Sequence, residues 1–375
     1  MIGDPVAGTV RRRNVLLPIE CDRSFEGMKR TVITTAIATT IVALGICLAP
    51  GRAVAQPHRT GSPEDHPPAN ITRLTGFGER AVWSPDGKRI AFMSKSFGDA
   101  FEIDLATRMT RLLTGHFRHA GFLRVHYLPN GDYLLIGARD FKDIRTTRDR
   151  DQELWLMKAS PRSAPIALGQ RISEGVAISR KRMRIAWSNT HGQYPDSIAE
   201  GESVLNMADV VYDSAGAPRL VNRRELLRAK RPECTLEAQD FRRDDQELVY
   251  VCYRERDKAD VFGLDLATGK STTYRKIEGE YNEVEGVSPD GAWALVESSR
   301  EQGADRQDSR HIDLWKLALV PNSTSFVRMT HWGDWDGYKA SNPTVSPDGK
   351  WFAFQSARSV DPAGVGYGIF LYRLK

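Results

Sequence analysis

The chain has 375 residues, of which 41% are hydrophobic and 27% charged, and a formal net charge of +5 at pH 7. The apolar content excludes a globally disordered chain, because it can supply the core of one large domain or two small ones. Three of the five net positive charges lie in residues 1–55. The rest of the chain is close to neutral and gives no indication of nucleic-acid binding.

The N-terminal part of the chain has the pattern of an export signal. A basic start at residues 28–30 precedes a mostly apolar run, and Ala53-Val54-Ala55 is a small-x-small cleavage site. We predict a signal peptide over residues 28–55 and treat residues 1–27 as an upstream extension that is not native. A transmembrane anchor is the alternative, but several threonines in the apolar run weaken it. The mature protein is expected to be periplasmic or secreted, without a stable membrane span.

Residues 56–70 have the composition of a linker. They are rich in Pro, His and small polar residues and show no apolar periodicity. We predict a disordered linker over this segment and a single folded domain over residues 71–375. The two linker histidines, His58 and His66, are expected to be solvated rather than bound to a metal.

A four-residue turn recurs along residues 71–375 and determines the predicted fold. Pro fixes φ at its second position, Asp caps the turn, and Gly takes a positive φ. A run with period two follows each copy, which indicates a half-buried strand. The clear copies are Ser84-Pro85-Asp86-Gly87, Ser288-Pro289-Asp290-Gly291 and Ser346-Pro347-Asp348-Gly349, a looser copy is Leu128-Pro129-Asn130-Gly131, and two decayed copies cover residues 179–182 and 242–245.

The spacing of the copies predicts a closed ring of blades. It is roughly 45 to 60 residues, which fits a four-stranded blade with variable loops. The sixth blade reaches the C-terminus with only three strands, whereas a spare strand at residues 71–75 precedes the first blade. We therefore predict an all-β fold, a six-bladed β-propeller of four-stranded antiparallel blades. In it, strand 71–75 completes the last blade and removes the exposed edges.

The turns and the strand pattern resemble the TolB-like propeller repeat family over about residues 71–375. The resemblance implies the fold and no single function, because this repeat serves periplasmic scaffolds, sugar lyases and peptidase accessory domains. The last portion, residues 338–343 through 364–370, resembles a subgroup of exported TolB-like proteins of unassigned activity.

Two cysteines remain after signal removal, Cys234 and Cys252. They flank the fourth turn at similar distances on either side, and such positions lie almost opposite each other in an antiparallel hairpin. Because exported proteins meet oxidising conditions, we predict a disulfide between them. The alternative is a pair of buried free thiols.

Several catalytic motifs are absent from the sequence. It contains no Gly-x-Ser-x-Gly elbow, no phosphate-binding Gly-rich loop with Lys-Ser/Thr, and no His-Glu-x-x-His. These absences exclude the peptidase half of some family members and a zinc site of the His-Glu-x-x-His type. The catalytic residues, if the protein is an enzyme, stay unknown.

A set of carboxylates is expected at one mouth of the central channel. The inner strand of each blade ends at the turn, so the position five residues before each turn should lie at the opposite end of the channel. The six blades carry there Glu79, Leu123, Glu174, Glu237, Glu283 and Ser341, with Glu285 two residues further on in the fifth blade. Close carboxylates repel each other unless they bind a cation, pair with a base or share protons. Ca²⁺ or Mg²⁺ would suit Glu174, Glu237 and Glu283 as ligands, whereas the alternative is a solvated ring without a ligand.

Long loops and aromatic residues are expected at the same mouth. Insertions over residues 139–151, 189–202, 299–310 and 358–367 all join second to third strands, and such clustering is typical of a binding face. Residues 331–339 enter the sixth blade there, and Trp335 and Tyr338 would suit stacking against a sugar or a peptide. Packing of the tryptophans between blades is the alternative.

Two functions follow from these patterns. The first is a binding or scaffold propeller for an envelope protein or glycan, expected to be a monomer. The second is a carbohydrate-active enzyme, a polysaccharide lyase or glycoside hydrolase, that uses carboxylates at the channel mouth with His126 or His191 as a base. Oligogalacturonate lyases, built from a similar repeat, have a histidine-rich metal site. Asn342 stands where such a site would have a histidine, so we favour the first function and place Asn342 among the ligand-binding residues.

Overall fold

A computed structural model describes residues 58–374 of the chain, apart from residues 256, 304 and 362–363. The predicted signal peptide, residues 28–55, and the upstream extension, residues 1–27, lie outside the described residues. Among the residues that are described, no helix is both long and apolar enough to cross a membrane.

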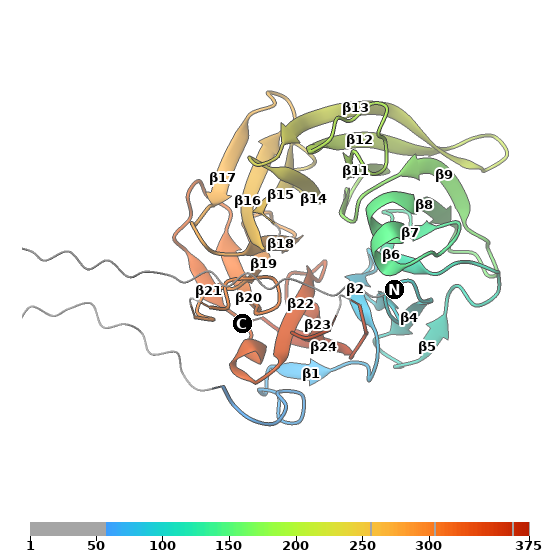
Figure 1. The fold of residues 1–375 in the computed structure, drawn as a ribbon. Helices are drawn as coiled ribbons and strands as arrows, with labels where there is room; N and C mark the ends of the chain where they lie inside the picture. Colours follow the sequence, from blue (N-terminus) through green and yellow to red (C-terminus); the bar gives the residue numbers. More distant parts are fainter. Residues whose placement is uncertain (1–57, 256, 304, 362–363, 375) are drawn as a thin grey trace, which may run out of the picture. The chain divides into compact units, whose positions relative to one another are not determined.

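Six antiparallel sheets of four strands each surround a central channel (Figure 1). From the inner to the outer strand, the first three are β2 (Glu79–Trp83), β3 (Arg89–Met93), β4 (Ala100–Asp104) and β5 (Thr110–Leu112); β6 (Phe122–Tyr127), β7 (Tyr133–Ala138), β8 (Gln152–Met157) and β9 (Ile166–Arg171); and β10 (Val176–Ile178), β11 (Arg184–Thr190), β12 (Glu202–Tyr212) and β13 (Pro218–Lys230). The others are β14 (Thr235–Arg242), β15 (Glu247–Glu255), β16 (Lys258–Asp265) and β17 (Ser271–Arg275); β18 (Asn282–Val287), β19 (Trp293–Ser298), β20 (Asp313–Ala318) and β21 (Phe326–Arg328); and β22 (Tyr338–Val345), β23 (Trp351–Arg358), β24 (Ile369–Arg373) and β1 (Ile71–Arg73). The predicted six-bladed propeller is confirmed.

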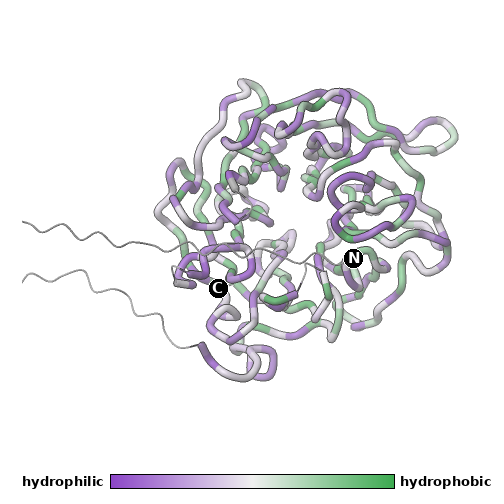
Figure 2. The backbone as a smooth tube through the Cα atoms, in the orientation of Figure 1, coloured by the Kyte–Doolittle hydropathy of each residue, from purple (hydrophilic) through white to green (hydrophobic). Residues whose placement is uncertain are grey.

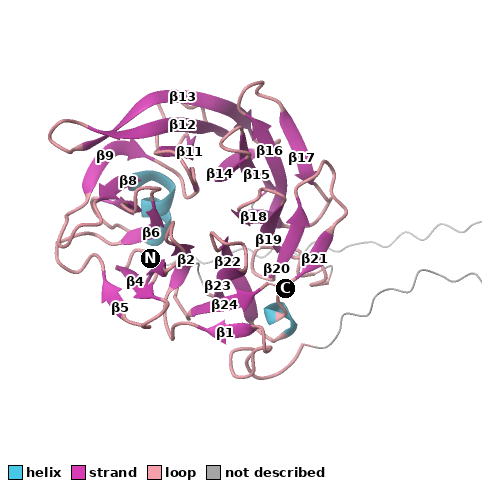
Figure 3. Ribbon diagram, turned by 180° about the vertical axis from the view of Figure 1, so that it is seen from behind, coloured by secondary structure: helices cyan, strands magenta, loops and turns pink. Residues whose placement is uncertain are grey.

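Helical turns are few within the described part of the chain (Figure 3). A turn of α-helix, α1 (Ile144–Thr146), leads into a π-helical turn, η1 (Thr147–Asp151), in the loop between β7 and β8. Asp143 caps α1 by accepting a hydrogen bond from the Thr146 backbone N–H at 2.8 Å. A 3₁₀ turn, η2 (Trp332–Asp334), precedes β22.

The recurring turn fixes the register of the inner hairpins. In the first blade, Ser84 Oγ donates to Asp86 Oδ1 at 2.5 Å and accepts from the Arg89 backbone N–H at 2.9 Å. Gly87 has a φ of 69°, a conformation that a side chain would strain. The turns at Ser288 and Ser346 repeat these contacts, so each inner strand meets its neighbour at the same offset.

The N-terminal strand closes the ring at the sixth blade. β1 pairs antiparallel with β24, with Ile71 opposite Tyr372 and Arg73 opposite Phe370. The strand is observed over residues 71–73, two residues shorter than the predicted 71–75. A hydrogen bond connects the sixth blade to the first, in which the Trp83 indole N–H donates to the Thr344 carbonyl oxygen at 3.1 Å.

The described part of the predicted linker, residues 58–70, contacts the sixth blade. The Arg59 backbone N–H donates to the Asp334 carbonyl oxygen at 2.8 Å, and Glu64 Oε1 lies 2.9 Å from Arg358 Nη1. These contacts give a defined course to a segment for which the sequence predicts disorder.

The hydrophobic core lies between neighbouring blades. One cluster joins Ala91 and Met93 of the first blade to Val125 and Leu135 of the second, and all four side chains are fully buried. Similar clusters follow around the ring, and Figure 2 shows hydrophobic residues interspersed with hydrophilic ones along the blades. Each blade therefore depends on its neighbours for burial of its two faces.

Cys234 and Cys252 form a disulfide in the structure, with their Cα atoms 5.2 Å apart. Cys234 directly precedes β14 and Cys252 lies in β15, and both residues are buried. The bond links the two inner strands of the fourth blade, whose turn has lost the Ser-Pro-Asp-Gly sequence.

We expect the double substitution Cys234→Ala and Cys252→Ala to lower the free energy of unfolding by about 3 kcal/mol, because the disulfide restricts the unfolded chain. Urea unfolding of the two proteins measures the difference. Peptide mapping of the unreduced native protein should show the two cysteines as one linked peptide pair. Alkylation of both thiols without reduction would contradict the prediction.

Candidate functional site

The inner strands bring a group of charged side chains into the channel. Neighbouring inner strands contact each other around the ring. The charged group, called the channel cluster below, consists of Glu79, Arg80, Arg124, Arg148, Glu174, Glu237, Glu283, Glu285, Glu297 and Lys339, together with Tyr253, Tyr281 and Asn342.

β-bulges aim several of these side chains. A bulge gives one strand an extra residue and redirects the side chains beside it. Five of the six inner strands change register close to the predicted carboxylate positions, namely β2, β6, β14, β18 and β22. Two of the bulged residues, Arg80 and Asn342, have φ values of 50° and 47°, and both belong to the channel cluster.

Three guanidinium groups meet at the carboxylate of Glu174. Arg80 Nη2 donates to Glu174 Oε1 at 2.7 Å, and Arg124 Nη2 donates to the same oxygen at 3.2 Å. Arg148, which reaches in from η1, forms an ion pair with the other oxygen. Glu174 is therefore the central anion of this part of the cluster.

Arg80 is held from several sides. It is 5% exposed, and its Nη1 also donates to Glu79 Oε1 at 2.7 Å and to Ser96 Oγ at 2.9 Å. Its backbone N–H donates to Gln355 Oε1 at 2.7 Å. Burial lowers the pKa of its guanidinium, but the neighbouring carboxylate of Glu79 opposes that shift.

Two tyrosines hold the carboxylate of Glu283. The hydroxyls of Tyr253 and Tyr281 both donate to it, one to each oxygen. Burial raises the pKa of both tyrosines well above the usual value, so they stay neutral donors. Glu283 thus gains hydrogen bonds without gaining a counter-charge.

Three further carboxylates bind protons unusually strongly. Burial, reinforced by the negative charge of Glu283, raises the pKa of Glu237 to about 7, and burial raises the pKa of Glu285 and Glu297 to about 8. Asn342 donates to both of the latter, from its backbone N–H to Glu297 Oε1 at 2.5 Å and from Nδ2 to Glu285 Oε1 at 3.1 Å. Arg124 is the nearest cation to Glu285, with Nη1 4.0 Å from its Oε2.

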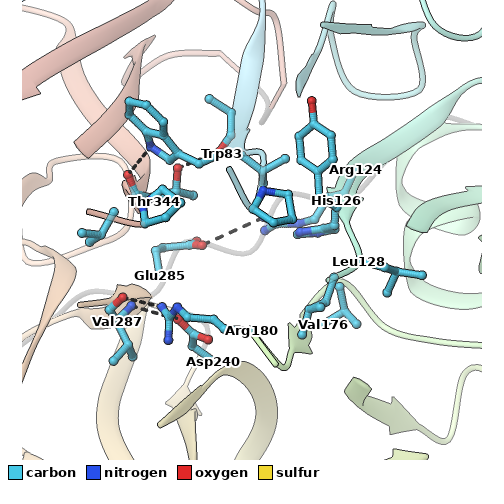
Figure 4. A pocket seen from close by; sticks show the side chains of 18 of the residues that line it. Trp83, Arg124, His126, Leu128, Val176, Arg180, Asp240, Glu285, Val287 and Thr344 are labelled. Carbon is cyan, nitrogen blue, oxygen red and sulfur yellow. Dashed lines mark hydrogen bonds and ion pairs between the residues drawn. The ribbon is translucent and has the colours of Figure 1, made fainter. Parts of the chain in front are cut away.

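A cavity of about 400 Å³ occupies the half of the channel nearest the recurring turns (Figure 4). Arg80, Arg124, Glu285 and Asn342 of the channel cluster line it, as do the turn residues Pro85, Pro129, Ser179 and Pro347. We call this cavity the turn-side pocket. It lies between the channel cluster and the end of the propeller opposite the long loops.

The structure brings together six of the eight residues predicted to bind a ligand. Glu79, Glu174, Glu237, Glu283, Glu285 and Asn342 all belong to the channel cluster. Trp335 and Tyr338 do not line the turn-side pocket. Instead, the guanidinium of Arg59 lies 5.8 Å from the ring centroid of Trp335, and that of Arg358 lies 3.9 Å from the ring centroid of Tyr338.

Sequence reasoning missed the cations of the cluster. Arg80 and Arg124 follow the predicted carboxylate position by one residue in the first two blades, so the same count back from the turn could have found them. Arg148 comes from a loop without periodicity, and no sequence pattern marks it. Lys339, whose Nζ donates to the Ser309 carbonyl oxygen at 3.1 Å, lies within the segment predicted to enter the sixth blade.

The histidines considered as bases occupy different places. His126 lines the turn-side pocket, and burial lowers its pKa to about 3, so its ring is neutral at pH 7. His191 lies in the loop between β11 and β12, where its Nδ1 is 2.8 Å from the Ile198 carbonyl oxygen. Within residues 58–374, outside the gaps named above, no group of three or more His, Cys, Asp or Glu residues is arranged to hold a metal ion.

We expect Glu174→Gln to lower the free energy of unfolding by about 3 kcal/mol, because it leaves three guanidiniums without their shared anion. The control is Glu200→Gln, which changes an exposed carboxylate in the loop between β11 and β12. Urea unfolding of both variants measures the effect. An equal stability of the two variants would show that the cluster does not depend on Glu174.

The raised pKa values of the carboxylates predict that stability falls between pH 6.5 and pH 8.5. In this range, the folded protein holds protons on Glu285 and Glu297 that the unfolded chain, with an ordinary pKa near 4.5, has lost. The expected loss is on the order of 1–2 kcal/mol for each group. His126 contributes in the opposite direction only at the lower end of this range, because about half of the unfolded chains still carry a proton on this ring at pH 6.5, its ordinary pKa. Urea unfolding at both pH values should show a smaller loss in Glu285→Gln, and a stability that rises with pH would refute the assignment.

Comparison with protein-family models finds no match, and no curated protein matches the sequence. Solved structures with a similar fold include a putative TolB from Agrobacterium tumefaciens, at 16% identity over 78% of each chain with a TM-score of 0.34. They also include TolB from Acinetobacter baumannii, at 10% identity over 81% of this chain and 65% of that chain with a TM-score of 0.46, and an oligogalacturonate lyase in complex with manganese, at 16% identity over 81% and 80% with a TM-score of 0.45. By its six blades and its Ser-Pro-Asp-Gly turns, the chain has a TolB-like propeller fold, and these similarities assign it no activity.

Proposed function

We propose that this protein is an exported binding or scaffold propeller of the envelope, which holds a protein or glycan partner at the loop-rich end of its channel. The connections between second and third strands leave the blades at this end, over residues 139–151, 191–201, 299–312 and 359–368. Binding residues are often carried by such loops on a rigid scaffold.

The observation that carries the proposal is the position of Arg148. This residue belongs to the loop between β7 and β8, yet its guanidinium pairs with Glu174 of the channel cluster. The next loop continues the contact, because Gln193 donates to the Asp149 carbonyl oxygen. A partner resting on the loops would therefore also meet the charged groups of the channel.

The chemistry of this end suits a partner with hydroxyl or amino groups. Glu237 and Glu283 are half-buried as whole residues, but Glu237 Oε1 is itself buried and has no hydrogen-bond partner in the described protein, while both oxygens of Glu283 accept from tyrosines. Carboxylates of this kind accept hydrogen bonds from sugar hydroxyls or from protonated amines. A divalent cation, Ca²⁺ or Mg²⁺, is a further ligand class to test, because the sequence predicts it, although the described residues bring no three ligand side chains together for a metal.

A carbohydrate-active enzyme is the second candidate. It is favoured by the raised pKa of Glu237, about 7, and of Glu285, about 8, because carboxyl groups that hold a proton near neutral pH can act as general acids. Binding is preferred because no complete set of catalytic groups can be named.

The two candidates make different predictions for Glu237→Gln. If the protein is a binding module, one of three ligand classes should raise its melting temperature: a neutral oligosaccharide, a basic peptide, or Ca²⁺ or Mg²⁺. The substitution should then lower the affinity for that ligand about tenfold, because it removes a charged acceptor. Thermal-shift screening followed by calorimetry measures this. Cleavage of a glycan that the same variant abolishes would instead support the enzyme.

The matched control is Lys270→Gln, an exposed change in the turn between β16 and β17 at the opposite end of the propeller. It should leave ligand affinity unchanged. A ligand that binds Glu237→Gln as tightly as the unaltered protein would contradict a site at the loop-rich end, as would a complete lack of response to the three ligand classes.

A further inference from the structure

The turn-side pocket has the size and walls of a small-molecule site. Its volume of about 400 Å³ falls within the range of ligand pockets in proteins, roughly 300–1,000 Å³. Apolar side chains form much of its wall, among them Val82, Trp83, Val125, Val176 and Val287. Figure 4 shows several of these side chains around the hollow. An apolar molecular body would be accommodated here.

Polar atoms without partners occur among the residues that line this pocket. Arg124 Nε, His126 Nε2 and Gln239 Nε2 are buried, and none of them has a hydrogen-bond partner in the described protein. A buried donor without an acceptor costs free energy on the order of 1–3 kcal/mol. A ligand that brings acceptor oxygens to this part of the pocket would recover that cost.

The charges that line the pocket favour an anion. Arg80, Arg124, Arg180 and Lys181 are cationic, whereas Glu285 and Asp240 are the acidic residues of the lining. Asp240 is engaged by Arg180, whose Nη2 lies 2.8 Å from its Oδ2, and Lys181 forms an ion pair with Asp244, which does not line the pocket. Arg80 and Arg124 are therefore the cations that matter for an anion here.

Glu285 reduces this positive charge little at neutral pH. Burial raises its pKa to about 8, so the carboxyl group is mostly protonated. Arg124 then has Glu174 as its main counter-ion, and Glu174 is shared with Arg80 and Arg148. Arg80, Arg124 and Arg148 thus share Glu174, and Glu79 is a further partner of Arg80; of these residues, Arg80 and Arg124 line the pocket.

We propose that the turn-side pocket binds a small organic carboxylate with an apolar body. The carboxylate accepts hydrogen bonds from Arg124 and Gln239, and the apolar body lies against the valines and Trp83. The proposal goes beyond the partner site at the loop-rich end, because ligand and partner approach the channel from opposite ends.

The turn of the third blade contributes to the mouth of this site. Its sequence, Ser179-Arg180-Lys181-Arg182, departs from Ser-Pro-Asp-Gly and places Arg180 where four of the other five blades have proline. Arg180 Nη2 donates to the Val287 carbonyl oxygen of the fifth blade at 2.7 Å, and Nη1 donates to the Phe241 carbonyl oxygen at 3.2 Å. The decayed turn therefore supplies a cation at the entrance to the pocket.

Three probes of equal length test the ligand class: hexanoate, hexylammonium and hexanol, each added to the full-length protein at pH 6.5. Hexanoate should raise the melting temperature and give measurable heat of binding, while the cation and the alcohol should bind at least tenfold more weakly. Equal binding of hexanol, tighter binding of hexylammonium, or no binding of hexanoate would overturn the proposal.

Substitution of an unpartnered group tests the position. Gln239→Leu removes a donor that makes no hydrogen bond within the described protein, so the free protein should stay as stable as the control His66→Leu, which changes an exposed histidine. Hexanoate should bind Gln239→Leu about tenfold more weakly, the effect of losing one charge-assisted hydrogen bond. Unchanged affinity in this variant would refute the site.

A crystal soaked with 6-bromohexanoate locates the molecule through the anomalous signal of bromine. The bromine should lie in the turn-side pocket, and a bromine found only elsewhere would refute the proposal. Because glycans, peptides and cations are screened at the loop-rich end with Glu237→Gln, failure of one site leaves the test of the other unaffected.

Discussion

Opposite charges, rather than apolar packing, occupy the middle of this propeller. Apolar side chains fill the spaces between blades, whereas the channel between the inner strands holds Glu174, which is shared by Arg80, Arg124 and Arg148. These residues come from two inner strands, a loop and the start of a third blade. Their contacts tie the first three blades together at the axis, and buried charges of this kind are costly unless all are paired.

In the remaining blades, the carboxyl groups at the channel are stabilised differently. Around Glu283, neutral tyrosines take the place of arginines, and Glu237, Glu285 and Glu297 retain protons because burial raises their pKa. One side of the channel is thus held by ion pairs. The other is held by hydrogen bonds to carboxyl groups that are either protonated or, like Glu283, without a counter-charge. This asymmetry gives the channel a cationic and a proton-binding side.

The fold could be predicted because the turn recurs, and because its Ser-Asp contacts set the same hairpin register in the three blades that keep the Ser-Pro-Asp-Gly sequence. Counting back from the turn also located Glu174, Glu237 and Glu283. The same count reaches Arg80 and Arg124 one residue later, but the direction of their side chains depends on bulges, which a count along a strand cannot foresee. Arg148 lies in a loop that has no repeat pattern to count along. The sequence predicts Trp335 and Tyr338 at the loop-rich mouth, and that prediction does not include the guanidiniums of Arg59 and Arg358 that lie over their rings.

The pairing of β1 with β24 has a consequence for the order of events during synthesis and export. β1 is the first strand of the domain to be made and β24 is the last, so the sixth blade cannot be completed by any partial chain. Bringing the two ends together closes a loop of nearly the whole domain, a late and entropically costly step. If the chain is exported as proposed above, it threads through a membrane unfolded, and the ring can close only after the last strand has crossed.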